Sequence, residues 1–244
     1  MSVPSRQQDG PRPPWSIQPT LQVQSWAFII GATLFALGSA PWLGGQLGTV
    51  GANVTFFVGA WFFTAGAFIQ LVLSGPHRID VHGGTGLRAV WVSAAVQLLG
   101  TLLFNVSTGA ALHARSVPAE RLEVWVPNAE GSVAFLISAW IAVIPLLRDR
   151  QYLRPSSPVW LSTWCNMFGS IAFGVSAVGA VVLENGELLS SEVATAGTFV
   201  GALLFVATSA VMLPTARRGA TPSSSEGGDD EKATGDPEVS SQET

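Results

Sequence analysis

The sequence predicts an all-α membrane protein, a bundle of six transmembrane helices arranged as three tandem helical hairpins with a period near 70 residues. Three observations predict this class. Of the 244 residues, 48% are hydrophobic and only 11% are charged, whereas a soluble domain carries about 25% charged residues. Six stretches are apolar over the roughly 17 to 25 residues that cross a bilayer. A motif of glycine, phenylalanine and a small residue also recurs six times.

The apolar stretches define the six predicted spans. They cover residues 26–43, 53–74, 89–112, 131–147, 158–183 and 193–213. Tryptophans fall at or near the span ends, where an indole prefers the headgroup boundary. Within these spans no Asp, Glu, Lys, Arg or His lies away from the ends. Since ionisable groups in the membrane are typical of proton relays and coupled transport, this pattern argues against an ion-driven transporter.

Consecutive spans pair into three predicted hairpin repeats, which cover residues 26–78, 89–150 and 158–214. Residues 1–25 contain five prolines and predict an extended, mobile N-terminus. Residues 219–244 hold seven acidic residues and one lysine, a net charge of −6. The whole chain has a net charge of −4, so residues 1–218 carry +2. The composition predicts a disordered acidic tail, which is a candidate contact for a cytoplasmic protein partner.

In each copy of the motif, phenylalanine follows glycine by four residues and a small residue follows by seven. The copies are Gly31/Phe35/Gly38, Gly59/Phe63/Gly66, Gly100/Phe104/Ser107, Gly131/Phe135/Ser138, Gly169/Phe173/Ser176 and Gly201/Phe205/Thr208. A random order of the 26 glycines and 13 phenylalanines gives only about 1.4 such Gly-Phe pairs, so the motif is treated as a repeat. The first, third and fifth copies are each 69 residues apart, and the other three are separated by 72 and 70.

Offsets of four and seven residues place the motif on one face of a helix. Glycine lets two helix backbones approach closely, and close packing drives helix association in lipid. We therefore predict that the motif forms the helix-packing seam, with a ligand cavity or narrow pore as the alternative. Three hairpins of equal length permit a pseudo-threefold arrangement about an axis along the membrane normal. A linear or irregular bundle would use the same contacts.

Amides are the main polar groups within the spans. Gln97 and Asn166 are 69 residues apart, and each lies three residues before its motif glycine, where the first repeat has Phe28. Asn105 lies in the same span as Gln97. These three amides predict either a hydrogen-bonded clamp between helices or the polar lining of a path for a neutral solute or lipid group.

The connection between the second and third spans contains His77, Asp80 and His82 in a glycine-rich context. These are residue types that ligate metals, but a solvated turn is the simpler interpretation. Arg78 and Arg88 are candidate contacts for an anionic lipid headgroup. We predict no metal site and no cofactor.

The connection between the third and fourth spans, residues 113–130, is the longest. Its Val117-Pro118 and Val126-Pro127 steps predict an irregular excursion along the outer surface. The carboxylates in this connection and in the one between the fifth and sixth spans are predicted to be solvated; they are Glu120, Glu123, Glu130, Glu184, Glu187 and Glu192. No nucleophile-base arrangement is identifiable, and no basic cluster exceeds three residues, which argues against an enzyme and against nucleic-acid binding.

Orientation follows from the lysines and arginines in the connections. Ten lie in the two terminal segments and the second and fourth connections, and two lie in the third connection. This distribution predicts that both termini are cytoplasmic in a bacterial inner membrane.

The stretches from Asn53 to Gln70 and from Asn166 to Ala177 carry the motif with dense small and aromatic residues. In this the chain resembles multi-pass membrane proteins, mostly actinobacterial, that contain YrhK-like segments, over roughly residues 26 to 214. That family has no established activity, so the resemblance implies membrane location and repeat architecture and no site residue.

These observations predict a non-enzymatic membrane protein with an envelope-structural or partner-binding role. The alternative is a passive channel or carrier for a small neutral or lipid-like molecule. Neither the oligomeric state nor the identity of a partner follows from the sequence.

Overall fold

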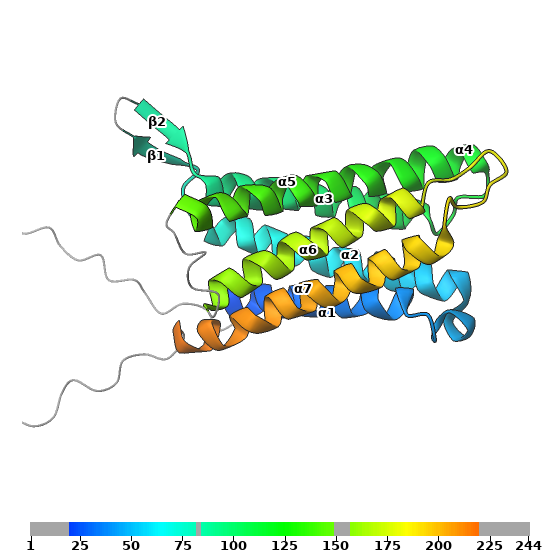
Figure 1. The fold of residues 1–244 in the computed structure, drawn as a ribbon, viewed down its shortest axis with the longest axis horizontal. Coiled ribbons are helices and arrows are strands. Elements are labelled where there is room, and N and C mark those ends of the chain that lie inside the picture. The colour runs from blue at the N-terminus through cyan, green and yellow to red at the C-terminus, as the bar shows by residue number, and fades with distance from the viewer. Residues whose placement is uncertain (1–19, 82–83, 149–156, 220–244) are drawn as a thin grey trace, which may run out of the picture.

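The computed structural model describes residues 20–81, 84–148 and 157–219 of the chain. Six long helices run side by side along one direction (Figure 1). They are α1 (Leu21–Ser39), α2 (Gly44–Leu73), α3 (Ala89–Ala110), α5 (Val126–Arg148), α6 (Pro158–Gly179) and α7 (Ser191–Gly219). Each contains a segment long and apolar enough to cross a bilayer, so the chain is a multi-pass membrane protein and the predicted fold class is confirmed.

The helices form three antiparallel hairpins, α1–α2, α3–α5 and α6–α7, and the hairpins form a closed ring. Within the ring α2 packs against α3, α5 against α6, and α7 against α1. This last contact joins the two ends of the sequence and makes the arrangement cyclic, a point that the period alone left open.

The two ends of the bundle differ (Figure 1). The start of α1, the end of α7 and a small β-hairpin lie at one end, which we call the termini end. The α1–α2, α3–α5 and α6–α7 connections lie at the other, the loop end. An even number of spans therefore returns the chain to the side from which it started.

Local capping explains where several helices begin. The Thr20 hydroxyl accepts a hydrogen bond from the Val23 N–H at 3.2 Å at the start of α1. Ser157 caps α6 through the Trp160 N–H at 3.1 Å, and Pro158 occupies the first turn, where its missing N–H costs nothing.

The first hairpin turns earlier than predicted. The first span was predicted to run to residue 43, but α1 ends at Ser39, just before Pro41. The second span was predicted from residue 53, whereas α2 begins at Gly44 and is kinked at Gly48. Gly48 has φ 61° and ψ 175°, a conformation that is essentially restricted to glycine. This glycine lets the helix continue past a bend that other residues would not tolerate.

The predicted irregular excursion over residues 113–130 is wrong. Residues 117–148 form one continuous helical span, made of α4 (Val117–Ala119), the π-helical η1 (Glu120–Trp125) and α5. Ser116 caps its start and Pro118 lies in the first turn, where proline is tolerated. Before Pro127 the helix widens, and the Val126 N–H bonds to the carbonyl of Arg121 five residues earlier.

Tertiary contacts hold this widened segment in place. The Arg121 Nε donates to the Val182 carbonyl at 2.8 Å, and the Trp125 indole N–H donates to the Ala177 carbonyl at 2.9 Å. Both bonds join the fourth span to the end of α6 and the loop that follows it. The fourth span therefore begins about fourteen residues earlier than predicted, and Glu130 lies inside it.

A small β-hairpin between α2 and α3 was not predicted. Its strands β1 (Arg78–Val81) and β2 (Gly84–Leu87) pair antiparallel at the termini end. The Arg88 N–H closes the hairpin by donating to the His77 carbonyl at 3.0 Å. The glycine-rich composition had indicated only a turn.

Candidate functional site

The motif glycines meet in pairs at the middle of each hairpin. Distances from an ideal Cβ atom, built on one glycine, to the carbonyl oxygen of its partner measure this approach. They are 2.9 Å for Gly31 to Gly59, 3.0 Å for Gly100 to Gly131, and 3.3 Å for Gly169 to Gly201. Contacts of 2.9 to 3.0 Å leave no room for a methyl group, so in the first two hairpins the backbones cross where only glycine fits.

The six motif phenylalanines gather on the axis of the bundle. All are 2% to 6% exposed and belong to one core cluster; they are Phe35, Phe63, Phe104, Phe135, Phe173 and Phe205. The three from the first helices of the hairpins form one triangle, with ring centroids 5.9 to 6.5 Å apart. The three from the second helices form another, with centroids 5.5 to 6.4 Å apart.

The two triangles stack on each other. Within each hairpin the two rings are 5.1 to 5.5 Å apart. Aromatic rings at these separations are in van der Waals contact. The six rings therefore fill the axis at the level where the helices cross, and we call them the phenylalanine plug.

The third motif position differs between hairpins in a way that matches its neighbour. In the first hairpin it is glycine, and an aromatic ring fills the space. A Cβ on Gly38 would lie 2.7 Å from the Phe56 ring, and one on Gly66 would lie 3.0 Å from the Phe28 ring. Both added rings extend the plug, because Phe56 packs against Phe35 and Phe28 against Phe63.

In the other two hairpins hydroxyl groups replace these Gly-Phe contacts. Ser93 and Ser138 each donate to the other's carbonyl, at 2.9 and 2.8 Å, and Gln97 Oε1 lies 3.1 Å from Ser138 Oγ. Ser176 Oγ donates to the Ala194 carbonyl and lies 2.7 Å from Thr198 Oγ1.

Two further motif residues complete the set. Thr208 Oγ1 is 3.4 Å from the Ser162 carbonyl, and Ser107 is buried in α3. The two ends of the axis are thus apolar beside the first hairpin and polar beside the others.

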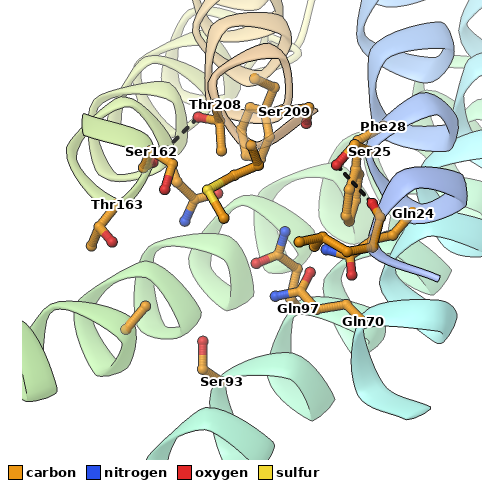
Figure 2. A pocket seen from close by; sticks show the side chains of 15 residues that line it. Gln24, Ser25, Phe28, Gln70, Ser93, Gln97, Ser162, Thr163, Thr208 and Ser209 are labelled. Atoms are coloured by element: carbon orange, nitrogen blue, oxygen red, sulfur yellow. Dashed lines mark hydrogen bonds between the residues drawn. The ribbon is translucent and has the colours of Figure 1, made fainter. Parts of the chain in front are cut away.

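A cavity of about 180 Å³ lies on the termini side of the plug, and all six long helices line it (Figure 2). We call it the terminal cavity. Three sets of equivalent repeat positions surround it: Gln24, Ser93 and Ser162; Phe28, Gln97 and Asn166; and Gln70, Ala142 and Met212. Phe205 of the plug also lines it. The described residues that line it include amides and hydroxyls and no ionisable group, a chemistry suited to hydrogen bonding with a neutral polar molecule.

The structure brings together two of the three predicted amides. Gln97, which is 5% exposed, and Asn166 both line the terminal cavity. Asn105 lies on the other side of the crossing level and donates through Nδ2 to Thr64 Oγ1 at 2.8 Å. This bond joins α3 to α2, and the Asn105 Oδ1 atom has no partner among the described residues.

A second cavity, of about 520 Å³, lies on the loop side of the plug, and we call it the loop cavity. Phe35 and Phe104 of the plug line it. The equivalent positions Phe56, Asn128 and Thr198 surround it. The axis therefore has a hollow on each side of the plug.

The predicted headgroup residues lie at the termini end. Arg88 Nη1 donates to the Ser74 carbonyl at 3.1 Å and so satisfies a terminal carbonyl of α2. The backbone of Arg78 begins β1, but its side chain, like the whole of His82, lies outside the described part. Their contact with lipid headgroups stays a prediction.

Sequence reasoning missed most of the terminal cavity. Gln24, Gln70 and Ser93 were not selected as site residues, although they occupy repeat positions equivalent to other lining residues. Extending the 69-residue period beyond the motif to every polar position would have found the first helices' share of this set.

Comparison of the chain with protein-family models, with curated proteins and with solved structures finds no match. The resemblance to proteins with YrhK-like segments therefore stays a prediction.

Proposed function

We propose that this chain is a non-enzymatic membrane protein with an envelope-structural or partner-binding role. The observation that carries the proposal is the phenylalanine plug, because it closes the one route through the bundle that the repeat symmetry would otherwise create. A solute would have to displace rings that lie 5.1 to 6.5 Å apart in a close-packed cluster.

The polar groups near the axis support the same role. They bond largely to one another across helix pairs, as Ser93 and Ser138 do. Such bonds hold helices in register in lipid, each with a modest free energy of about 1 kcal/mol.

We further propose that the protein lies in the bacterial cell membrane with both termini cytoplasmic. Ten of the twelve basic residues belong to segments at or leading from the termini end, as the positive-inside rule requires of the cytoplasmic side. On this orientation the acidic tail, which lies outside the described residues, would face cytoplasmic proteins. Deletion of residues 219–244 tests this part, since an unchanged set of partners cross-linked in membranes would remove the tail from the proposal.

Permeation is the second candidate function, and the two cavities on one axis favour it. Hydrophobic constrictions between wet cavities can gate by dewetting. In that case the plug would be a gate rather than a permanent seal.

Flux measurements separate the two candidates. The protein is reconstituted into liposomes, and the permeation of water, glycerol and urea is followed by stopped-flow light scattering. A closed bundle gives rates equal to those of empty liposomes. Flux through the wild type that is lost in Asn166→Leu, and kept in the lipid-facing control Phe168→Leu, would establish permeation and overturn the structural role.

A further inference from the structure

One carboxylate, Glu130, lies at mid-membrane depth. The helix α3 has 22 residues, which gives a length of about 33 Å, close to the thickness of the hydrocarbon core. Gly100 lies at its midpoint, and a Cβ on Gly131 would lie 3.0 Å from the Gly100 carbonyl oxygen. Glu130 is the residue next to Gly131, so its backbone lies at this middle level.

The tryptophans give an independent measure of depth. Three of them lie nine residues from a motif glycine toward the termini end: Trp91, Trp140 and Trp160. Nine helical residues span about 13.5 Å, close to half of the hydrocarbon thickness. Trp42 follows the end of α1 at the loop end and is also exposed. Since tryptophan marks both interfaces, the glycine level is the centre of the bilayer.

Glu130 faces away from the bundle. Its side chain is exposed, and it is not among the residues that line the two axial cavities. The equivalent positions in the other hairpins are Val58 and Val200, which are 41% and 48% exposed. Two of the three equivalent outward positions therefore carry the side chain expected in lipid, and the third carries a carboxylate.

A carboxylate at the centre of a bilayer is costly, and residues of this kind generally mark functional sites. Lysine and arginine relieve such a cost by extending to the interface. Glutamate is too short to cross the roughly 15 Å to the headgroups. A group inside the bilayer is therefore needed to pair with it.

We propose that the outward face of α5 around Glu130 binds a transmembrane helix of another protein that presents lysine or arginine at the same depth. This inference names a partner class for the partner-binding role proposed above and rests on it. A second copy of this chain does not supply the cation. The nearest basic residue along the span, Arg121, is nine residues from Glu130 toward the loop end, about 13.5 Å away along the axis.

Binding to a model helix tests the pairing. The probes are two polyleucine transmembrane peptides, one with a central lysine and one with leucine there. The full-length protein is placed in phosphatidylcholine liposomes, with a donor fluorophore on Glu187→Cys in a Cys165→Ser background. Energy transfer to an acceptor on each peptide then reports association.

We expect the wild type to bind the lysine peptide about tenfold more tightly than the leucine peptide. Glu130→Val removes this preference and Glu130→Gln removes most of it, because the amide has no charge. Both variants replace an outward side chain, so the bundle is retained. Glu123→Val is the matched control, since Glu123 is also exposed and lies seven residues away on the same helix face, and it leaves the preference unchanged. Equal binding of the two peptides to the wild type, or a preference that survives Glu130→Val, would overturn the proposal.

Two more measurements close the remaining routes. A fluorophore on Glu130→Cys, in the Cys165→Ser background, is expected to be quenched most by lipids brominated near the chain end, and quenching only by headgroup-level bromines would refute the assigned depth. Single-molecule photobleaching that found wild-type dimers and Glu130→Val monomers would assign this face to a second copy instead. Failure of the peptide test leaves a sealed bundle intact, whereas wild-type solute flux would refute the proposed function itself, so the two failures are distinguishable.

Discussion

Gly100 and Gly131 lie backbone against backbone at the centre of the second hairpin, where a Cβ atom on either one would lie 3.0 Å from the carbonyl oxygen of the other. Their approach sets the spacing of α3 and α5. It also brings Phe104 and Phe135 to a centroid separation of 5.1 Å in the plug. One pair of glycines thus positions one edge of the aromatic core.

Replacing Gly100 by alanine is expected to destabilise the protein. The new Cβ would lie 2.6 Å from Phe135 Cδ1 and 3.0 Å from the Gly131 carbonyl, so the ring and the helices must move. Overpacking of this kind costs about 1–3 kcal/mol of unfolding free energy, measurable by steric trapping in bicelles. Gly109→Ala in the same helix is the control, because its Cβ meets only the Phe57 ring at 3.4 Å. Equal stability of the two variants would contradict a packing role for the motif.

Removing one ring of the plug is expected to cost more. Phe135 is 2% exposed and contacts four other rings of the cluster. Phe135→Ala should lower the free energy of unfolding by about 3–5 kcal/mol, because it leaves a cavity in a packed core. Phe168→Ala, at an outward position that is 53% exposed, should change it by less than about 0.5 kcal/mol. A loss below 1 kcal/mol for Phe135→Ala would show that the cluster can collapse around the gap.

The reciprocal Ser93–Ser138 pair should show coupling in a double-mutant cycle. Each hydroxyl donates to the other residue's carbonyl, so either alanine substitution removes part of the same network. The expected coupling energy is about 0.6 kcal/mol, the average for hydrogen bonds between membrane helices. Ser170 bonds only within its own helix, and a Ser93→Ala/Ser170→Ala cycle should give none. Additivity in the first cycle would mean that the pair contributes nothing to stability.

Cysteine labelling checks the orientation of the bundle. In a Cys165→Ser background, Leu87→Cys at the termini end should resist a membrane-impermeant maleimide in intact cells. Glu187→Cys in the loop between α6 and α7 should react. Both positions are exposed, so access depends on the side of the membrane alone. The reverse pattern would place both termini outside.

Most of the fold could be predicted from the sequence, but the fourth span shows where such prediction failed. Two prolines and several charged residues in 113–130 indicated a loop, yet the segment is helical because Pro118 lies in a first turn and the π-helical stretch precedes Pro127. The bonds from Arg121 and Trp125 to the end of α6 and the adjoining loop hold it there. No local pattern announces partners more than fifty residues away.

The sequence by itself determined the number of long helices, their pairing into hairpins and the period of the repeat. Apolar length, helical periodicity and the spacing of small residues are local properties, and the bilayer leaves few other ways to satisfy the backbone. Only the tertiary structure decided that the ring closes through α1 and α7, that six distant phenylalanines converge on one axis, and that Glu130 faces outward at the level of the helix crossings. These features depend on how helices rotate and cross when they pack, which is set by contacts between residues far apart along the chain.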